Sequence, residues 1–247
     1  MNASLCLVSC SDIAASMEEK YLGLLSNSER RRYDRFLRPQ RRRQFLAGRV
    51  LLRHMLSMEF GRPVDTWRFE ERAGLPPRLL TELPNPAACS LAHSRDFAIC
   101  LLTPEGSVGV DIEYLDADRD FLAIATHFYS AAHARRLAAL PLDEQRILFY
   151  RYWTLNEAVA KMGPCGDTGW ASRQEGSAPN RDLVVVTTIL RNYGIAAAIH
   201  GDFTVPSTIG LLRPDGLVEP GPYCTWQRHG EEEVGAVGFK LSRANQW

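Results

Sequence analysis

The run FAICLLTPEGSVGVDIE, residues 97–113, shapes the architecture of this 247-residue chain more than any other part of it. Phe97 to Thr103 is an apolar run of strand length, and Pro104 and Gly106 mark a turn. Val108 to Glu113 then forms a second run of strand length. These residues predict two strands joined by a tight turn, a β-hairpin.

Helices are predicted on both sides of this hairpin. Upstream, Ser26 and Glu29 fit a capping box, so a helix begins near Ser26. Pro39 ends that helix or begins the next one. Downstream, Phe121 to Leu140 is helical in composition, and Asp143 to Met162 carries an apolar stripe at helical spacing.

The last part of the chain predicts strands. Gly163 to Arg181 is rich in Gly, Ser, Asn and Pro, and we expect a mobile loop there. Antiparallel strands are expected at Leu183–Leu190, Ile195–Ile199, Phe203–Leu212, Tyr223–Arg228 and Ala236–Leu241. Because helices and strands segregate along the chain rather than alternate strictly, the predicted fold class is α+β.

Composition excludes several classes of protein. Hydrophobic residues make up 45% of the chain and charged residues 23%, which is typical of a globular protein. Twenty-nine basic residues balance 29 acidic ones, so no net charge attracts nucleic acid or membrane, and no apolar run has the length of a membrane span. The 6 cysteines include no CxxC pair, which indicates reduced thiols and a cytoplasmic location.

Two carboxylates form the first candidate site. Asp111 and Glu113 lie two apart on a predicted strand and project to the same face, while Val110 and Ile112 face the core. Adjacent carboxylates repel unless a cation lies between them, and oxygen ligands favour magnesium or calcium. A solvated strand end would show the same pattern.

Two other groups of residues are candidates. Trp153, Glu157 and Lys161 share one helix face, where Glu157 and Lys161 could equally form a surface ion pair. His93-Ser94 is expected in a loop before a strand, although a lone histidine is more often structural. The sequence contains no GxSxG, HExxH, GxGxxG or GxxxxGK[ST] motif, so hydrolase-elbow, metallohydrolase, dinucleotide and P-loop classes have no support.

An ordered set of short motifs covers roughly residues 26–166. It comprises Phe45-Leu-Ala-Gly-Arg49 after the arginine-rich helix, Gly74-Leu-Pro76, Ser90-Leu-Ala-His-Ser94, Gly109-Val-Asp-Ile-Glu113, Phe128-Tyr-Ser130 and Phe149-Tyr-Arg-Tyr-Trp-Thr-Leu-Asn-Glu-Ala158. In this order the set resembles the 4′-phosphopantetheinyl transferase superfamily, in particular its long, single-chain, surfactin-synthetase-activating type.

The resemblance implies two similar α+β halves, residues 1–106 and 107–247, related by a pseudo-twofold with the active site at their junction. It implies transfer of the phosphopantetheine arm of magnesium-bound coenzyme A to a serine of an acyl or peptidyl carrier protein in polyketide or peptide biosynthesis. A monomer is expected, with no nucleic-acid or membrane partner.

Residue roles follow from the same resemblance. Asp111, Glu113 and Glu157 would hold magnesium, and Glu157, or a water on the metal, would take the serine proton. Coenzyme A would be bound by Arg32 or Arg43 together with His93, Ser94, Asn156 and Lys161. Of these, His93 would contact the 3′-phosphate and Lys161 would lie near the pyrophosphate and support catalysis.

Three positions depart from the family pattern. The family usually has lysine where this chain has Leu75 and Asn156, and glutamate where it has His133. A diverged member that binds coenzyme A or a carrier protein with little or no transfer is therefore an alternative. Nucleic-acid binding by the arginine-rich stretch Arg30–Arg43 is another, which the neutral total charge argues against.

Overall fold

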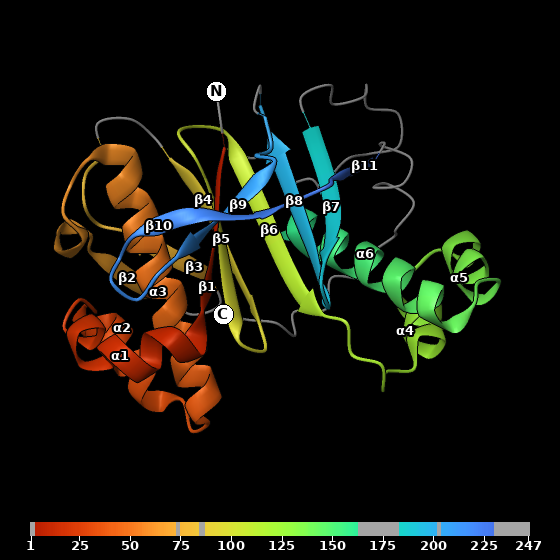
Figure 1. The fold of residues 1–247 in the computed structure, drawn as a ribbon, viewed down its shortest axis with the longest axis horizontal. Coiled ribbons are helices and arrows are strands. Elements are labelled where there is room, and N and C mark those ends of the chain that lie inside the picture. The colour runs from red at the N-terminus through yellow and green to blue at the C-terminus, as the bar shows by residue number, and fades with distance from the viewer. Residues whose placement is uncertain (1–2, 73–74, 84–86, 163–182, 202–203, 230–247) are drawn as a thin grey trace.

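A computed structural model describes residues 3–72, 75–83, 87–162, 183–201 and 204–229 (Figure 1). The helices are α1 Cys10–Leu22, α2 Asn27–Arg35, α3 Pro39–Phe60, the 3₁₀ turn η1 Val64–Thr66, α4 Phe121–Phe128, α5 Ala131–Ala138 and α6 Leu142–Lys161. The strands are β1 Ser4–Ser9, β2 Phe69–Arg72, β3 Leu75–Leu79, β4 Ala88–Ser94, β5 Phe97–Thr103, β6 Ser107–Tyr114, β7 Leu183–Leu190, β8 Tyr193–His200, β9 Thr208–Leu212, β10 Val218–Tyr223 and β11 Gln227–His229. The predicted α+β class is confirmed.

The strands form two larger sheets and one small ribbon within the described residues. The larger sheets have the orders β10-β9-β1-β5-β4 and β11-β7-β8-β6, and β2 pairs with β3. All pairs are antiparallel except β1 with β9, so the expectation of purely antiparallel pairing is wrong at that position. The proposed boundary at residues 106 and 107 falls in the β5–β6 turn, whereas β9 and β10 return to the sheet of the first half.

The predicted hairpin at residues 97–113 is only half correct. Both strands form, but β5 pairs with β1 and β4, whereas β6 pairs with β8. The reason is burial of apolar side chains from both strands. Val110 and Ile112 of β6 share one core with Ile99 and Leu101 of β5, so the turn carries the chain into a second sheet that packs on the first.

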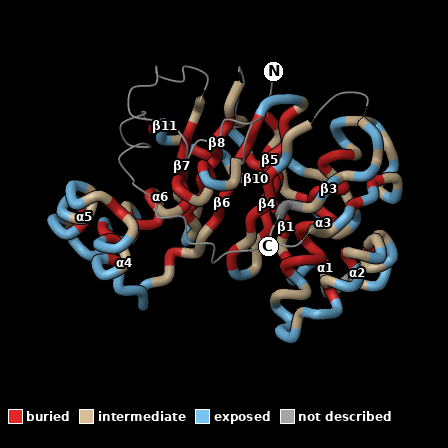
Figure 2. Tube along the Cα trace, turned by 180° about the vertical axis from the view of Figure 1, so that it is seen from behind, coloured by how far each residue is buried: buried red, intermediate tan, exposed pale blue. Residues whose placement is uncertain are grey.

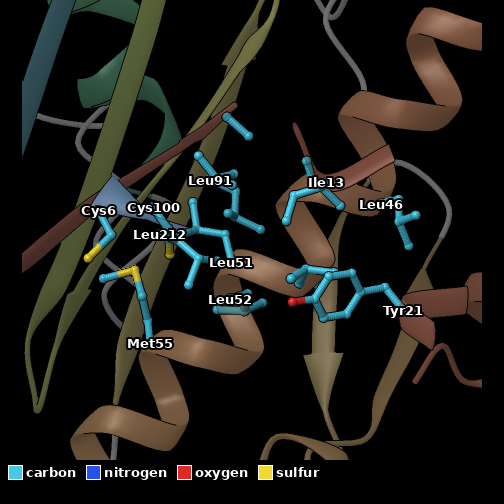
Figure 3. Packing of buried hydrophobic residues seen from close by; sticks show 14 of the residues in the cluster. Cys6, Ile13, Tyr21, Leu46, Leu51, Leu52, Met55, Leu91, Cys100 and Leu212 are labelled. Atoms are coloured by element: carbon cyan, nitrogen blue, oxygen red, sulfur yellow. The ribbon is translucent and has the colours of Figure 1, made fainter. Parts of the chain in front are cut away.

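Helices cover the outer faces of the two sheets (Figures 1 and 2). Leu51 and Leu52 of α3 pack on β1 and β5, and Ile13 and Tyr21 of α1, which lies against α3, belong to the same core (Figure 3). On the other sheet α6 lies against β6, β7 and β8, and α4 and α5 pack on its N-terminal part. The order is therefore helix, sheet, sheet, helix.

The helix predictions are confirmed where local signals were strong. Ser26 caps α2, and a full capping box with Glu29 is present. Pro39 is the first residue of α3, which ends at Gly61 in the left-handed conformation that favours glycine. Helix α6 corresponds closely to the predicted helix over residues 143–162.

The strand predictions are confirmed in part. Strand β7 has the expected bounds, and β8 includes the expected one. The strand expected at 203–212 is shortened to β9, and the one at 223–228 is divided between β10 and β11. The expected loop at 163–181 and strand at 236–241 lie outside the described residues. None of the described helices is long and apolar enough to span a membrane.

Candidate active site

Helix α6 lies directly on the outer face of β6 because Gly109 leaves room for it. A Cβ atom at position 109 would fall on the carbonyl oxygen of Ala158. The strand alternation places Asp111 and Glu113 on this same face, while Val110 and Ile112 are 0% and 1% exposed on the other. The close approach brings the α6 side chain of Lys161 over the strand carboxylates.

Gly109→Ala is therefore expected to destabilise the protein by about 1–3 kcal/mol, because helix and strand backbones must separate. Urea unfolding monitored by circular dichroism measures the change. Gly48→Ala in α3 is the control, since its added Cβ meets nothing within 4 Å and alanine favours a helix. Equal stability of the two variants would show that α6 has no fixed distance from β6.

Asp111 is the centre of the carboxylate cluster. Its Oδ1 accepts a hydrogen bond of 2.6 Å from Lys161 Nζ, whereas its buried Oδ2 has no hydrogen-bond partner among the described residues. Burial raises the pKa of Asp111, and the charge of Lys161 opposes that shift. Lys161 of the helix therefore forms an ion pair with Asp111 of the strand, a pair that the sequence did not predict.

The negative charge of Asp111 affects the pKa of the other two carboxyl groups, Glu113 and Glu157. Burial and the charge of Asp111 raise the pKa of Glu113 to about 7. Burial and the same charge raise the pKa of Glu157. Within the described residues no three His, Cys, Asp or Glu side chains converge closely enough to enclose a metal ion. The unpartnered oxygen and the mutual repulsion nevertheless fit a small cation, since a positive charge would relieve both.

His93 and Ser94 end strand β4, so their expected location in a loop is wrong. The register continues through them, with His93 opposite Ala98 and Ser94 opposite Phe97. The hydroxyl of Ser94 accepts from the backbone N–H of Tyr114 at 2.9 Å and donates to Glu113 Oε2 at 3.0 Å. Ser94 thus contacts the carboxylate cluster directly.

His93 lies in a niche between α3 and β4. Burial and the charges of Arg41 and Lys161 lower the pKa of His93 to about 4, so it is neutral at neutral pH. Arg41 Nη1 lies 3.2 Å from its Nε2. The niche is lined by Phe36, Arg41, Gln44, Phe45, Gly48, Arg49, Leu91, Ala92, His93 and Ala98. Aromatic and cationic side chains therefore line one hollow around His93.

The two arginines predicted from sequence, Arg32 and Arg43, are not among the described residues that line the niche. Arg32 pairs with Glu71 at 2.7 Å, and Arg43 is exposed and does not line the niche. Arg41, which sequence reasoning passed over, is the arginine beside His93. Its spacing from Phe45 and Arg49, four and eight residues along α3, was the signal that could have identified it.

The three departures from the family pattern lie in different places. Asn156 is buried on α6, and its Nδ2 has no hydrogen-bond partner in the part of the chain that the structure describes. Leu75 is the first residue of β3. His133 Nδ1 lies 2.8 Å from the hydroxyl of Ser130, the residue that caps α5. Only Asn156 belongs to the helix that carries Glu157 and Lys161.

Comparison with known proteins identifies the family of this chain. Residues 107–199 match the model of the 4′-phosphopantetheinyl transferase superfamily, a range that includes β6 and α6. The chain is 31% identical over 165 residues to the 4′-phosphopantetheinyl transferase AcpT of Escherichia coli K12, covering 67% of this chain and 79% of AcpT. The chain therefore belongs to the 4′-phosphopantetheinyl transferase superfamily.

Two further relatives align over a smaller share of their length. The 4′-phosphopantetheinyl transferase HetI of Nostoc is 32% identical over 56% of this chain and 58% of HetI. The 4′-phosphopantetheinyl transferase Sfp of Bacillus subtilis is 28% identical over 58% of this chain and 62% of Sfp. The chain thus spans about three fifths of these two relatives.

Proposed function

We propose that this protein transfers the 4′-phosphopantetheine arm of coenzyme A to a serine of an acyl or peptidyl carrier protein, with magnesium. The observation that carries the proposal is the proximity of two unlike subsites. The niche at His93 lies near the carboxylates of β6, because Ser94, the next residue of β4, donates to Glu113 Oε2 at 3.0 Å. The charge of Lys161, which is bound to Asp111, also lowers the pKa of His93. A nucleotide with phosphates at one end requires such a combination.

Each subsite has a distinct part in binding. Arg41 supplies positive charge in the niche, whereas the charge of Arg49 is already paired with Glu71 at 2.6 Å. Phe36 and Phe45 supply flat apolar surface for a purine ring. His93, although neutral, can donate a hydrogen bond from its one ring N–H to the 3′-phosphate. Coenzyme A bound in this way would extend its pyrophosphate toward Lys161.

Asp111, Glu113 and Glu157 would hold the magnesium ion. Bound magnesium neutralises charge on the pyrophosphate and on the leaving group as the bond breaks. In the structure the ammonium group of Lys161 pairs with Asp111 and supplies a positive charge at this position. Lys161 would then move its charge to the phosphates when Asp111 binds the metal.

The chemical step is a displacement at phosphorus. The serine oxygen forms a bond to the phosphorus that bears pantetheine, and the anhydride bond to the nucleotide breaks, which releases 3′,5′-ADP. Glu157 lies on α6 one turn before Lys161, and a carboxylate at this position can accept a proton from the incoming hydroxyl. Glu157 would take the serine proton.

Incubation with magnesium, coenzyme A and an apo carrier protein tests the proposal directly. Intact-mass measurement should show one phosphopantetheine added to the carrier, and none without magnesium. Addition to a carrier whose acceptor serine is replaced by alanine should not occur. Coenzyme A binding without any transfer would contradict the proposal and favour a diverged binding protein.

Carrier recognition is expected to be electrostatic, at the exposed arginines of α5. Arg135 and Arg136 lie on the small helical lobe next to α6, and carriers in this family's reactions present an acidic helix. Reversal of both charges to glutamate should raise the KM for the carrier about tenfold at low salt and leave coenzyme A affinity unchanged. Arg213→Glu, on the β9–β10 turn, is the control. An unchanged KM for the carrier would contradict this expectation.

A further inference from the structure

Along the edge of β6 that faces β4, backbone amides bind serine side chains of β4 and not its backbone carbonyls. β6 pairs with β8 along one edge, and β4 pairs with β5. Across the gap between β4 and β6, Ser90 Oγ accepts from Val110 N at 3.1 Å and Ser94 Oγ accepts from Tyr114 N at 2.9 Å. Two serines four residues apart therefore bind two amides four residues apart.

The two serines differ in what their own hydroxyl protons do. Ser94 donates its proton to Glu113 Oε2 at 3.0 Å. No acceptor for the proton of Ser90 is found among the described residues, and both side chains are buried. The amide of Tyr114 fixes the Ser94 oxygen, so its remaining donor direction is fixed toward the carboxylate.

We propose that Ser94 is a positioning residue that anchors one oxygen of Glu113 and leaves the other for the ligands of the site. The inference rests on the proposed function, and it assigns the Ser94 hydroxyl to the protein's own acid and not to coenzyme A. The arrangement is needed because Glu113 shares a strand face with Asp111. Without an anchor, mutual repulsion would turn the Glu113 side chain away from the site.

Ser94→Ala and its matched control Ser90→Ala distinguish two roles of Ser94. One is to position Glu113, and the other is only to join β4 to β6. Each variant leaves one β6 amide without its serine acceptor, so both should lower the urea midpoint by similar amounts. Magnesium affinity, measured by calorimetry with coenzyme A present and no carrier, should fall roughly 10–100-fold in Ser94→Ala and stay unchanged in Ser90→Ala. The turnover number should fall in the same variant, with the KM for the carrier unchanged.

Crystal structures of the two ligand-free variants provide a readout that does not depend on activity. Glu113 should leave its position in Ser94→Ala and keep it in Ser90→Ala. If Glu113 keeps its position in both, or if both variants bind magnesium equally well, Ser94 only joins the strands and the inference is wrong. If the wild-type protein transfers nothing, the proposed function fails, and the position of Glu113 in the two crystal structures still decides the role of Ser94.

Discussion

Asp111→Asn is expected to slow phosphopantetheine transfer by a factor of about 100 or more while the protein stays folded. Asparagine keeps the volume of the side chain and an oxygen that can accept from Lys161 Nζ, but it removes the charge next to the unpartnered Oδ2. Loss of one charged ligand at a metal that stabilises phosphoryl transfer costs about 3 kcal/mol, and each 1.36 kcal/mol is tenfold in rate.

The measurement is a time course of carrier modification by intact mass over a magnesium series, with a thermal melt of each variant. The protein should stay folded, because asparagine keeps an acceptor for Lys161, whose side chain is partly exposed to water. Glu105→Gln, an exposed acid in the turn before β6, is the control and should transfer normally. A wild-type rate and magnesium dependence in Asp111→Asn would place the metal elsewhere. Unfolding would show that Asp111 is structural.

Much of this site was predictable because its residues follow local periods. The strand period places Asp111 and Glu113 on one face, and the helical period aligns Glu157 with Lys161. Gly109 is part of the same pattern, but its reason is visible only in three dimensions, where α6 touches the strand backbone. Local periods therefore predict which side chains share a face, and packing decides which face they meet.

The partners of the strands were not predictable in the same way. Two apolar runs separated by a turn can form neighbouring strands of one sheet, or strands of two sheets that pack face to face. β5 and β6 pack face to face because both have apolar side chains to bury in one core. The strand β1 and helix α1 were missed, since the run from Leu5 to Cys10 is short and the following residues lack a strong apolar stripe.

The arginine contacts were ambiguous for a different reason. Eight arginines lie between residues 30 and 43, and no local pattern separates those that face a ligand from those that face solvent. Only the packing of α3 on β4 selects Arg41 as the neighbour of His93. The role of Ser94 also depends on a long-range feature, because it requires the edge of β6 to lie beside β4.

Glu29→Ala is expected to destabilise the protein by about 3–5 kcal/mol, the largest stability change predicted for this chain. Glu29 is 0% exposed and joins α2 to α3 through ion pairs with Arg53 at 2.6 Å and Arg49 at 3.4 Å. It also accepts from the backbone N–H of Ser26 in the capping box. Its removal leaves the buried Arg53 without a carboxylate, and domains have only about 5–15 kcal/mol of stability in total.

Urea unfolding measures this loss against a control on the same helix. Asp34 pairs with Arg30 at 3.4 Å, but both side chains are about half exposed, so Asp34→Ala should cost less than about 0.5 kcal/mol. Glu29→Gln, which keeps an acceptor for Ser26 without the charge, should fall between the two and remain measurable if Glu29→Ala does not fold. Similar midpoints for all three variants would contradict the prediction. If the loss of stability follows the order Glu29→Ala, Glu29→Gln, Asp34→Ala, the buried ion pairs fix the position of α3. They then also fix Arg41 and Arg49, which line the niche where coenzyme A is proposed to bind.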